Sequence, residues 1–205
     1  MQNAEQEKLV FVDIETAGLE RWRPIIQIAA IAVDSNLEIQ EEFDERILFS
    51  NEDADPKSLN KNSYCQRIWQ RRGLEKKVAA INFAQFLRRH ATVDLRSTGG
   101  KIYQLAQLVA HNSHFDSEFL IHWYRKMDFY FPALPRSLCT LQRAMWLIEE
   151  NKTLSPPQDF KLQTLCDYFG VRLGKEKAHD AYFDVLATLE PVSYTHLTLP
   201  TKRIV

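Results

Sequence analysis

The 205-residue chain has only three cysteines, and their spacing excludes two classes of small cross-linked domain. Cys65, Cys139 and Cys166 are odd in number and form no CxxC pair. A disulfide framework needs paired cysteines and a structural zinc site needs closely spaced ones, so neither is expected. We interpret the three as small, buried or half-buried side chains.

A long hydrophobic run is also missing. No apolar stretch approaches the roughly 20 residues that a membrane-spanning helix needs. The segment from Met1 to Lys8 is polar and acidic, unlike a signal peptide. With 45% hydrophobic and 26% charged residues, the length fits one globular domain with a full core. We therefore expect a soluble, cytoplasmic protein with no membrane partner.

The sequence has no excess of positive charge. Its formal net charge is -1, so the molecule as a whole does not attract nucleic acid, and any such binding must be local or helped by bound metal. One basic stretch, Arg67 to Lys77, surrounds Trp69 and could grip a phosphate backbone and stack a base. The alternative, which we favour, is a solvated surface with one buried Trp.

The most informative stretch is Phe11 to Gly18, which forms a short apolar strand ending in two acids. Side chains alternate along a strand, so Val12 and Ile14 share one face while Asp13 and Glu15 emerge together on the other. Two carboxylates this close repel and raise each other's pKa unless a cation lies between them. The stretch therefore indicates a metal site, and the alternative is an acidic turn that closes a strand.

Hydrophobic patterning predicts a sheet with helices around it. Residues 25–33 are almost continuously apolar, which is typical of a strand covered on both faces. Residues 37–49 predict a more acidic edge strand, and the short turns imply an antiparallel meander. Residues 50–62 are expected to form a polar loop, and residues 93–101 a loop or insertion.

The second half of the chain alternates one further strand with helices. A strand is predicted at 105–111. Helices are predicted at 78–90, 113–127, 137–150 and 160–169 and from about Asp180 onward.

The starts of two predicted helices in this half carry side chains that could bind a metal ion. Ser113 and Asp116 form a start resembling a capping box, so Asp116 on its own could merely stabilise a helix N-terminus. Asp180 can cap the last helix, which puts His179 just ahead of it and Asp184 one turn in. In isolation, a His such as His179 or an Asp such as Asp184 is most often a solvated surface residue, but the two together could face one site.

Histidines near the middle of the chain raise the possibility of zinc. His111, His114 and His122 lie close in sequence, but their spacing fits no common set of zinc ligands. We therefore do not expect a zinc site there.

Three groups of residues follow one another in a fixed order. They are Asp13-x-Glu15 with Thr16, His111-Asn112 with Phe115-Asp116, and His179-x-x-x-x-Asp184. This order resembles the DnaQ-like exonucleases with four carboxylates and one histidine (DEDDh type), a family that includes proofreading subunits, RNase T and oligoribonuclease. The resemblance covers nearly all of residues 8–190. One departure is Ala17, where many members have a second Thr.

The resemblance implies a ribonuclease H-like α/β fold with a five-stranded mixed sheet flanked by helices. It implies two Mg²⁺ or Mn²⁺ ions held by Asp13, Glu15, Asp116 and Asp184. His179 would act as general base on the attacking water. The residues expected to position the terminal nucleotide or support the strand end beside it are Thr16, Gly18, Leu19 and Asn112.

The implied reaction is release of nucleoside 5'-monophosphates from the 3' end of single-stranded nucleic acid, DNA being favoured over RNA. A DNA polymerase is a candidate partner. One alternative is a non-catalytic, polymerase-associated or nucleic-acid-binding module, against which the presence of all five catalytic-type residues argues. Another is a phosphodiesterase acting on short oligonucleotides. A polymeric substrate is favoured if the stretch Arg67 to Lys77 lines the groove.

The C-terminal segment 192–201 resembles the translation of a common sequencing adaptor. We therefore expect residues 1–190 to form the exonuclease domain, with its last helix truncated, and residues 191–205 to be a non-native tail. The alternative is a natural β-prone tail.

Overall fold

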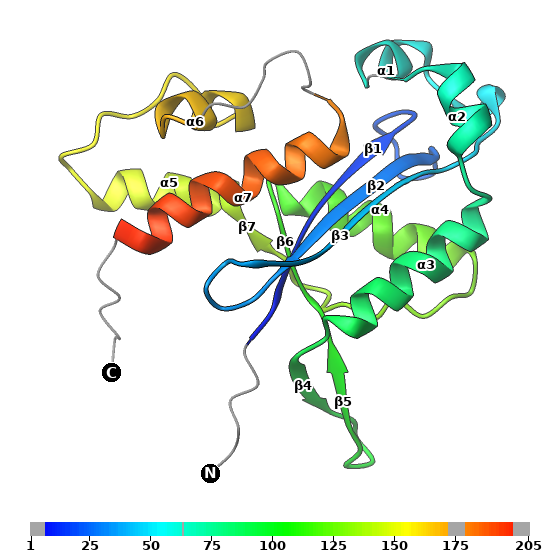
Figure 1. The fold of residues 1–205 in the computed structure, drawn as a ribbon, viewed down its shortest axis with the longest axis horizontal. Helices are drawn as coiled ribbons and strands as arrows, with labels where there is room; N and C mark the ends of the chain where they lie inside the picture. The colour runs from blue at the N-terminus through cyan, green and yellow to red at the C-terminus, as the bar shows by residue number, and fades with distance from the viewer. Residues whose placement is uncertain (1–6, 63, 172–178, 199–205) are drawn as a thin grey trace.

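A five-stranded mixed sheet forms the centre of the molecule, as the sequence predicts. The computed structural model describes the backbone of residues 7–62, 64–171 and 179–198. The strand order is β3-β2-β1-β6-β7, and helices cover both faces of the sheet (Figure 1). Among the described helices, none is both long and apolar enough to cross a membrane.

The first three strands form the predicted antiparallel meander. β1 (Leu9–Thr16) pairs along its length with β2 (Ile25–Val33), and β2 pairs with the edge strand β3 (Ile39–Arg46). All of β2 is buried, in agreement with its continuous apolar sequence. β3 is shorter than predicted, because Leu37 has a positive φ in the preceding turn and Ile47 forms only an isolated bridge.

Two short parallel strands complete the sheet. β6 (Gln107–Ala110) lies beside β1, and β7 (Leu138–Cys139) lies beside β6. The predicted strand 105–111 is thus divided, since Leu105 belongs to a separate hairpin of β4 (Val93–Arg96) and β5 (Ile102–Leu105). The loop predicted at 93–101 is wrong: its glycines form only the turn, where Gly100 has a positive φ.

The loop predicted at residues 50–62 is also wrong, since the segment contains η1 (Asn51–Asp53) and α1 (Pro56–Lys61). The carboxylate of Asp55 caps α1 by accepting a hydrogen bond from the Lys57 amide, and Pro56 occupies the first turn, where its missing N–H costs nothing.

The basic stretch forms α2 (Gln66–Arg72) and the first turn of α3 (Lys76–Arg89). Trp69 is buried, and its indole Nε1 donates to the carbonyl of Ile26 at 2.9 Å. Trp69 therefore cannot stack a base, and the favoured interpretation of a buried Trp is confirmed. Cys65, just before α2, is exposed, contrary to expectation.

The remaining helices are α4 (Ser113–Lys126), α5 (Thr140–Glu150), α6 (Leu162–Tyr168) and α7 (Ala181–Thr198). α5 begins later than predicted because Leu138 and Cys139 pair with β6.

Side chains along β1 alternate between the two faces of the sheet, and this alternation places the apolar and acidic residues. Val10, Val12 and Ile14 pack in a core with α3 and α4, whereas Phe11 packs in a second core with residues of α7. Asp13 and Glu15 share the parity of Phe11, so they lie on the α7 face. The two acids therefore emerge where α7 crosses the sheet.

Candidate active site

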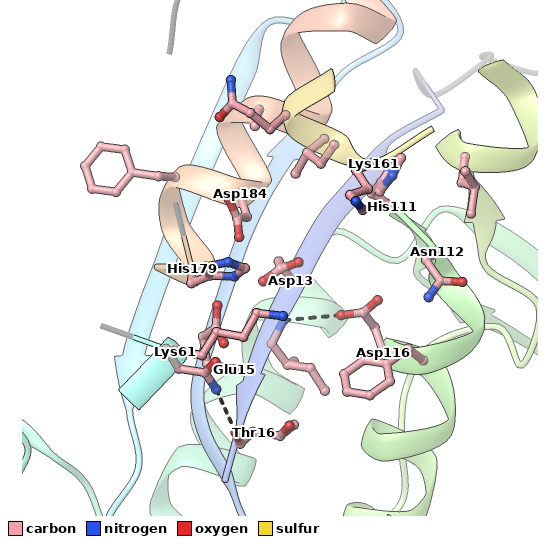
Figure 2. A pocket seen from close by; sticks show the side chains of 18 of the residues that line it. Asp13, Glu15, Thr16, Lys61, His111, Asn112, Asp116, Lys161, His179 and Asp184 are labelled. Carbon is pink, nitrogen blue, oxygen red and sulfur yellow. Dashed lines mark hydrogen bonds between the residues drawn. The ribbon is translucent and has the colours of Figure 1, made fainter. Parts of the chain in front are cut away.

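One pocket brings together all five residues expected to act in catalysis. It has a volume of about 800 Å³ and opens over the end of β1. Figure 2 shows side chains from β1, α4 and α7 converging on it. Those of the expected set are Asp13, Glu15, Asp116, His179 and Asp184.

Three of the carboxylates come from β1 and from the start of α4 beside it. Asp13 and Glu15 stand on β1, and Glu15 is only 7% exposed. Asp116, in the first turn of α4 and 3% exposed, accepts a hydrogen bond through Oδ1 from the Ile14 amide at 3.3 Å. Asp116 is therefore tied to β1 and does more than cap its own helix. The N-cap residue of α4 is Asn112 rather than Ser113, and it has a φ of 61°.

The opposite wall is the start of α7. Asp180 caps the helix by accepting a hydrogen bond from the Tyr182 amide at 3.1 Å, as predicted. His179 immediately precedes this cap and has a φ of 65°. One ligand atom each from Glu15, His179 and Asp184 lie within 4.8 Å of one another. The helix start thus carries an imidazole and a carboxylate to the acids of β1.

Burial raises the pKa values of the four acids, and repulsion by neighbouring carboxylates adds to it at some of them. Burial is the largest cause for each, and for Asp13 and Glu15 the neighbouring carboxylates add to it. The pKa of Asp13 lies well above its ordinary value, that of Glu15 rises to about 8, that of Asp116 to about 7 and that of Asp184 to about 6. A set of acids with this arrangement is suited to binding cations.

The residues fit hard divalent cations by their chemistry. Mg²⁺ and Mn²⁺ prefer carboxylate oxygens, and four such groups line one pocket. The pKa of His179 is lowered, first by burial and then by the positive charge of Lys61. A neutral imidazole near pH 7 can accept a proton.

Two lysines that the sequence did not single out also line the pocket. Lys61 at the end of α1 lowers the pKa of Glu15, and Lys161 precedes α6. Next to Lys61, buried Asn62 donates through Nδ2 to the carbonyl of Thr16 at 2.7 Å. Lys61 and Asn62 were missed because residues 50–62 were expected to form a loop, whereas Lys161 falls in the helix predicted at 160–169.

Three of the four residues expected to bind the nucleotide line the pocket. Thr16 is buried and donates its hydroxyl to the carbonyl of Gly18 at 2.6 Å. Leu19 is 80% exposed at the mouth, and Asn112 is exposed. Gly18 is not among the lining residues, and a Cβ there would come within 2.6 Å of Arg23 Cγ, so the loop packs closely against this glycine.

The histidines considered for zinc do not gather. Both ring nitrogens of His111 are engaged, Nδ1 with Thr140 Oγ1 at 3.1 Å and Nε2 with the Phe160 carbonyl at 3.0 Å. His114 lies on the surface beside Glu118 at 3.5 Å. The basic stretch Arg67 to Lys77 contributes no residue to the pocket lining, so the feature expected to favour a polymer is not met.

Comparisons with known proteins agree with this geometry. The family model RNase_T, described as Exonuclease, matches residues 10–191. E. coli exonuclease I in complex with a dT13 oligonucleotide is similar in structure, with a TM-score of 0.72 and 18% identity over 93% of this chain and 41% of that one. A zinc-ion-bound E. coli exonuclease I–ssDNA complex gives a TM-score of 0.74 and 18% identity over 96% of this chain and 42% of that one.

The chain thus spans about two fifths of the length of these structures. No curated protein matches it. The ribonuclease H-like fold is confirmed by the shared architecture. Because the family model covers most of the sequence, the chain belongs to the DnaQ-like exonuclease family.

Proposed function

We propose that this chain is a 3'-5' exonuclease that depends on divalent metal and releases nucleoside 5'-monophosphates from single-stranded DNA. The observation that carries the proposal is the convergence of four carboxylates with raised pKa values and one histidine in a single pocket. Similarity to oligonucleotide complexes of exonuclease I supports single-stranded DNA as substrate.

The roles proposed for the residues follow from where they lie. Asp13, Glu15, Asp116 and Asp184 would hold two Mg²⁺ or Mn²⁺ ions. When bound, such ions supply charge stabilisation at phosphorus and lower the pKa of water. His179, beside Glu15 and Asp184 and with a lowered pKa, takes the proton of the attacking water.

The substrate residues shape the pocket around the 3' end. Buried Thr16 fixes the turn after β1 through its hydroxyl, and Leu19 offers an apolar side chain at the mouth. Asn112 lines the side next to α4. Lys61 and Lys161 bring positive charge to a pocket of acids, where they can contact the phosphates of the substrate.

Two alternatives differ from this proposal in clear ways. A phosphodiesterase of short oligonucleotides is favoured by one observation, namely that the basic stretch Arg67 to Lys77 stays away from the pocket. A non-catalytic module is disfavoured because four buried or half-buried acids gathered in one pocket destabilise a protein that has no cation to bind. The similar structures named above are complexes with oligonucleotides, so we propose no polymerase partner.

The proposal is tested with 5'-labelled single-stranded DNA and RNA of 2, 4 and 12 nucleotides, in Mg²⁺ and in EDTA. We expect a product ladder that shortens from the 3' end in Mg²⁺ only. Asp116→Asn should reduce the rate at least about 100-fold, because a group that stabilises charge in the transition state is lost. Asp94→Asn, the same change on the β4–β5 hairpin, should leave the rate unchanged.

Each other result has a definite meaning. Cleavage of the dinucleotide but not of the 12-mer would select the short-oligonucleotide enzyme. A folded protein without any ladder would overturn the exonuclease. Faster shortening of RNA than of DNA would reverse the proposed preference.

A further inference from the structure

A second, smaller hollow adjoins the active-site pocket. Its volume is about 400 Å³, and it lies between the β1–β2 loop and α4. It shares Leu19, Asn112 and Phe115 with the active-site pocket, so the two hollows adjoin at these side chains. A substrate that fills the first pocket and extends past Leu19 therefore reaches the second.

The principal apolar side chain of the second hollow is Trp22, which is 64% exposed. Two backbone hydrogen bonds close its loop, from the Ala17 amide to the Pro24 carbonyl and from the Arg23 amide to the Glu20 carbonyl, both at 2.8 Å. Arg23 Nη1 also donates to the Asp53 carbonyl at 2.9 Å. The backbone that carries Trp22 is thus held in place, which limits the entropy lost when the exposed indole binds a ligand.

Polar groups around Trp22 suit a nucleotide. The side chains of Arg21 and His114 are both exposed, and both lie against Glu118. Exposed contacts of this kind are weak, so a phosphate can replace Glu118 as the partner of Arg21 or of the His114 ring. Because Glu20 and Glu118 offset the charge of Arg21, binding here should depend on stacking more than on salt.

An exposed aromatic side chain beside Arg21 and His114, in a hollow that adjoins a nuclease pocket, favours a nucleic-acid strand over a protein segment as the occupant. Bases stack on aromatic side chains whatever their sequence, because each base has a π-face. A protein segment would have no reason to follow the edge shared with the active-site pocket.

We propose that the second hollow is a binding subsite for the base of the next-to-last nucleotide, which stacks on Trp22 while the terminal nucleotide occupies the active-site pocket. This rests on the proposed exonuclease function and deepens it, because it assigns a substrate of at least two nucleotides. The base-independent nature of stacking predicts little sequence preference at this position.

The test compares Trp22→Ala with a matched control, Trp146→Ala. Trp146 on α5 is also 64% exposed but lines neither hollow. The rate of the first cleavage of a single-stranded 12-mer is measured as kcat/KM in Mg²⁺. We expect Trp22→Ala to lower kcat/KM about 5- to 100-fold, Trp22→Phe to restore most of it and Trp146→Ala to change nothing.

A second arm removes the base instead of the indole. An abasic residue next to the 3' end should lower kcat/KM of the wild type by about the same factor as Trp22→Ala, and should cost nothing further in that variant. An abasic residue at the fourth position from the 3' end should have little effect on either protein.

The outcomes separate the two proposals. A wild type that cleaves normally while Trp22→Ala behaves like Trp146→Ala would overturn the subsite, and is the result expected if this face binds a protein. An abasic cost that persists in full in Trp22→Ala would also overturn it. A folded wild type with no cleavage would overturn the exonuclease itself.

Discussion

The two walls of the active-site pocket hold their functional groups by different means. On the sheet wall, Asp13 and Glu15 take their positions from β1, whose backbone pairs with β2 along its length and with β6. On the helix wall, the places of His179 and Asp184 depend on where α7 begins. That start is fixed by side chains, because the capping carboxylate of Asp180 also contacts Gln27 Nε2 at 3.3 Å and Arg46 Nη2 at 3.5 Å.

This difference indicates which substitutions the pocket tolerates. A backbone ladder survives the loss of a side chain, so changes to the acids of β1 should alter chemistry and charge but not geometry. A helix start that depends on a few polar contacts can shift when one of them is removed. Arg46 is central to those contacts, since it also pairs with Asp44 at 3.2 Å and lies 5.3 Å from the centroid of the Trp69 ring.

The largest effect that we expect is on the stability of the folded protein when no metal ion is bound to the four acids. The pKa values of Glu15, Asp116 and Asp184 rise to about 8, 7 and 6 by burial. Their folded pKa values exceed the unfolded ones near 4, so the folded state binds more protons between about pH 4 and 8. Stability in EDTA should therefore fall as pH rises through this range. The lowered pKa of His179 makes stability rise with pH, but this is the contribution of one group against those of several acids.

Thermal unfolding in EDTA and in Mn²⁺ measures this effect. Mn²⁺ at about 100 times its Kd should raise the Tm by about 5–10 °C, because only the folded state assembles the site. The rise should be larger at pH 8 than at pH 6, since protons compete with the metal for the acids. Asp116→Asn should weaken the pH dependence and Asp94→Asn should not. Equal Tm values in Mn²⁺ and EDTA at both pH values would rule out the metal site.

A smaller effect is expected from the helix wall. Arg46→Met keeps an apolar stem against Trp69 but removes the partner of Asp180. We expect kcat to fall about 10-fold with KM nearly unchanged, because a small displacement of His179 and Asp184 misaligns the reacting groups. Arg46→Lys should recover part of the loss.

The matched control for Arg46 is Arg89→Met. Arg89 also pairs with an acid, Glu41, and lies 6.0 Å from the centroid of the Phe86 ring, but it is far from the pocket lining. This variant should keep the full kcat. A normal kcat in Arg46→Met would show that packing of α7 on the sheet is sufficient to place the helix.

The smallest effect concerns the tail. We propose that residues 1–190 are the exonuclease domain and that residues 191–205 are a non-native tail. Every proposed site residue precedes Glu190, although the backbone of α7 continues to Thr198. Because all proposed site residues remain, removal of residues 191–205 should change kcat/KM less than about 2-fold, and a non-native tail should change Tm by no more than about 3 °C. A large loss of stability would show that the tail belongs to the domain.

The sequence predicts the sheet wall better than the helix wall. Alternation along β1 is a local property, so the shared face of Asp13 and Glu15 follows from spacing alone. That Asp116, His179 and Asp184 reach the same place depends on contacts across the whole chain, such as the hydrogen bond from the Ile14 amide to Asp116. Only the family resemblance predicted this convergence.

The errors have local causes as well. α1 has six residues, too few for hydrophobic periodicity to be visible, so Lys61 and Asn62 were not recognised. Their place at the pocket is set by tertiary bonds, including the one from Asn62 to the Thr16 carbonyl. Trp69 lies among basic residues, and its burial is decided by the distant Ile26 carbonyl.

The parallel pairing of β1 with β6 also bears on the order of folding. The β1–β2–β3 meander joins neighbouring segments and can form early, whereas β6 must close a loop containing most of the first half of the chain. We therefore expect Asp116, which follows β6 in the chain, to join Asp13 and Glu15 late in folding. A metal ion that binds only the completed site should then slow unfolding rather than speed folding.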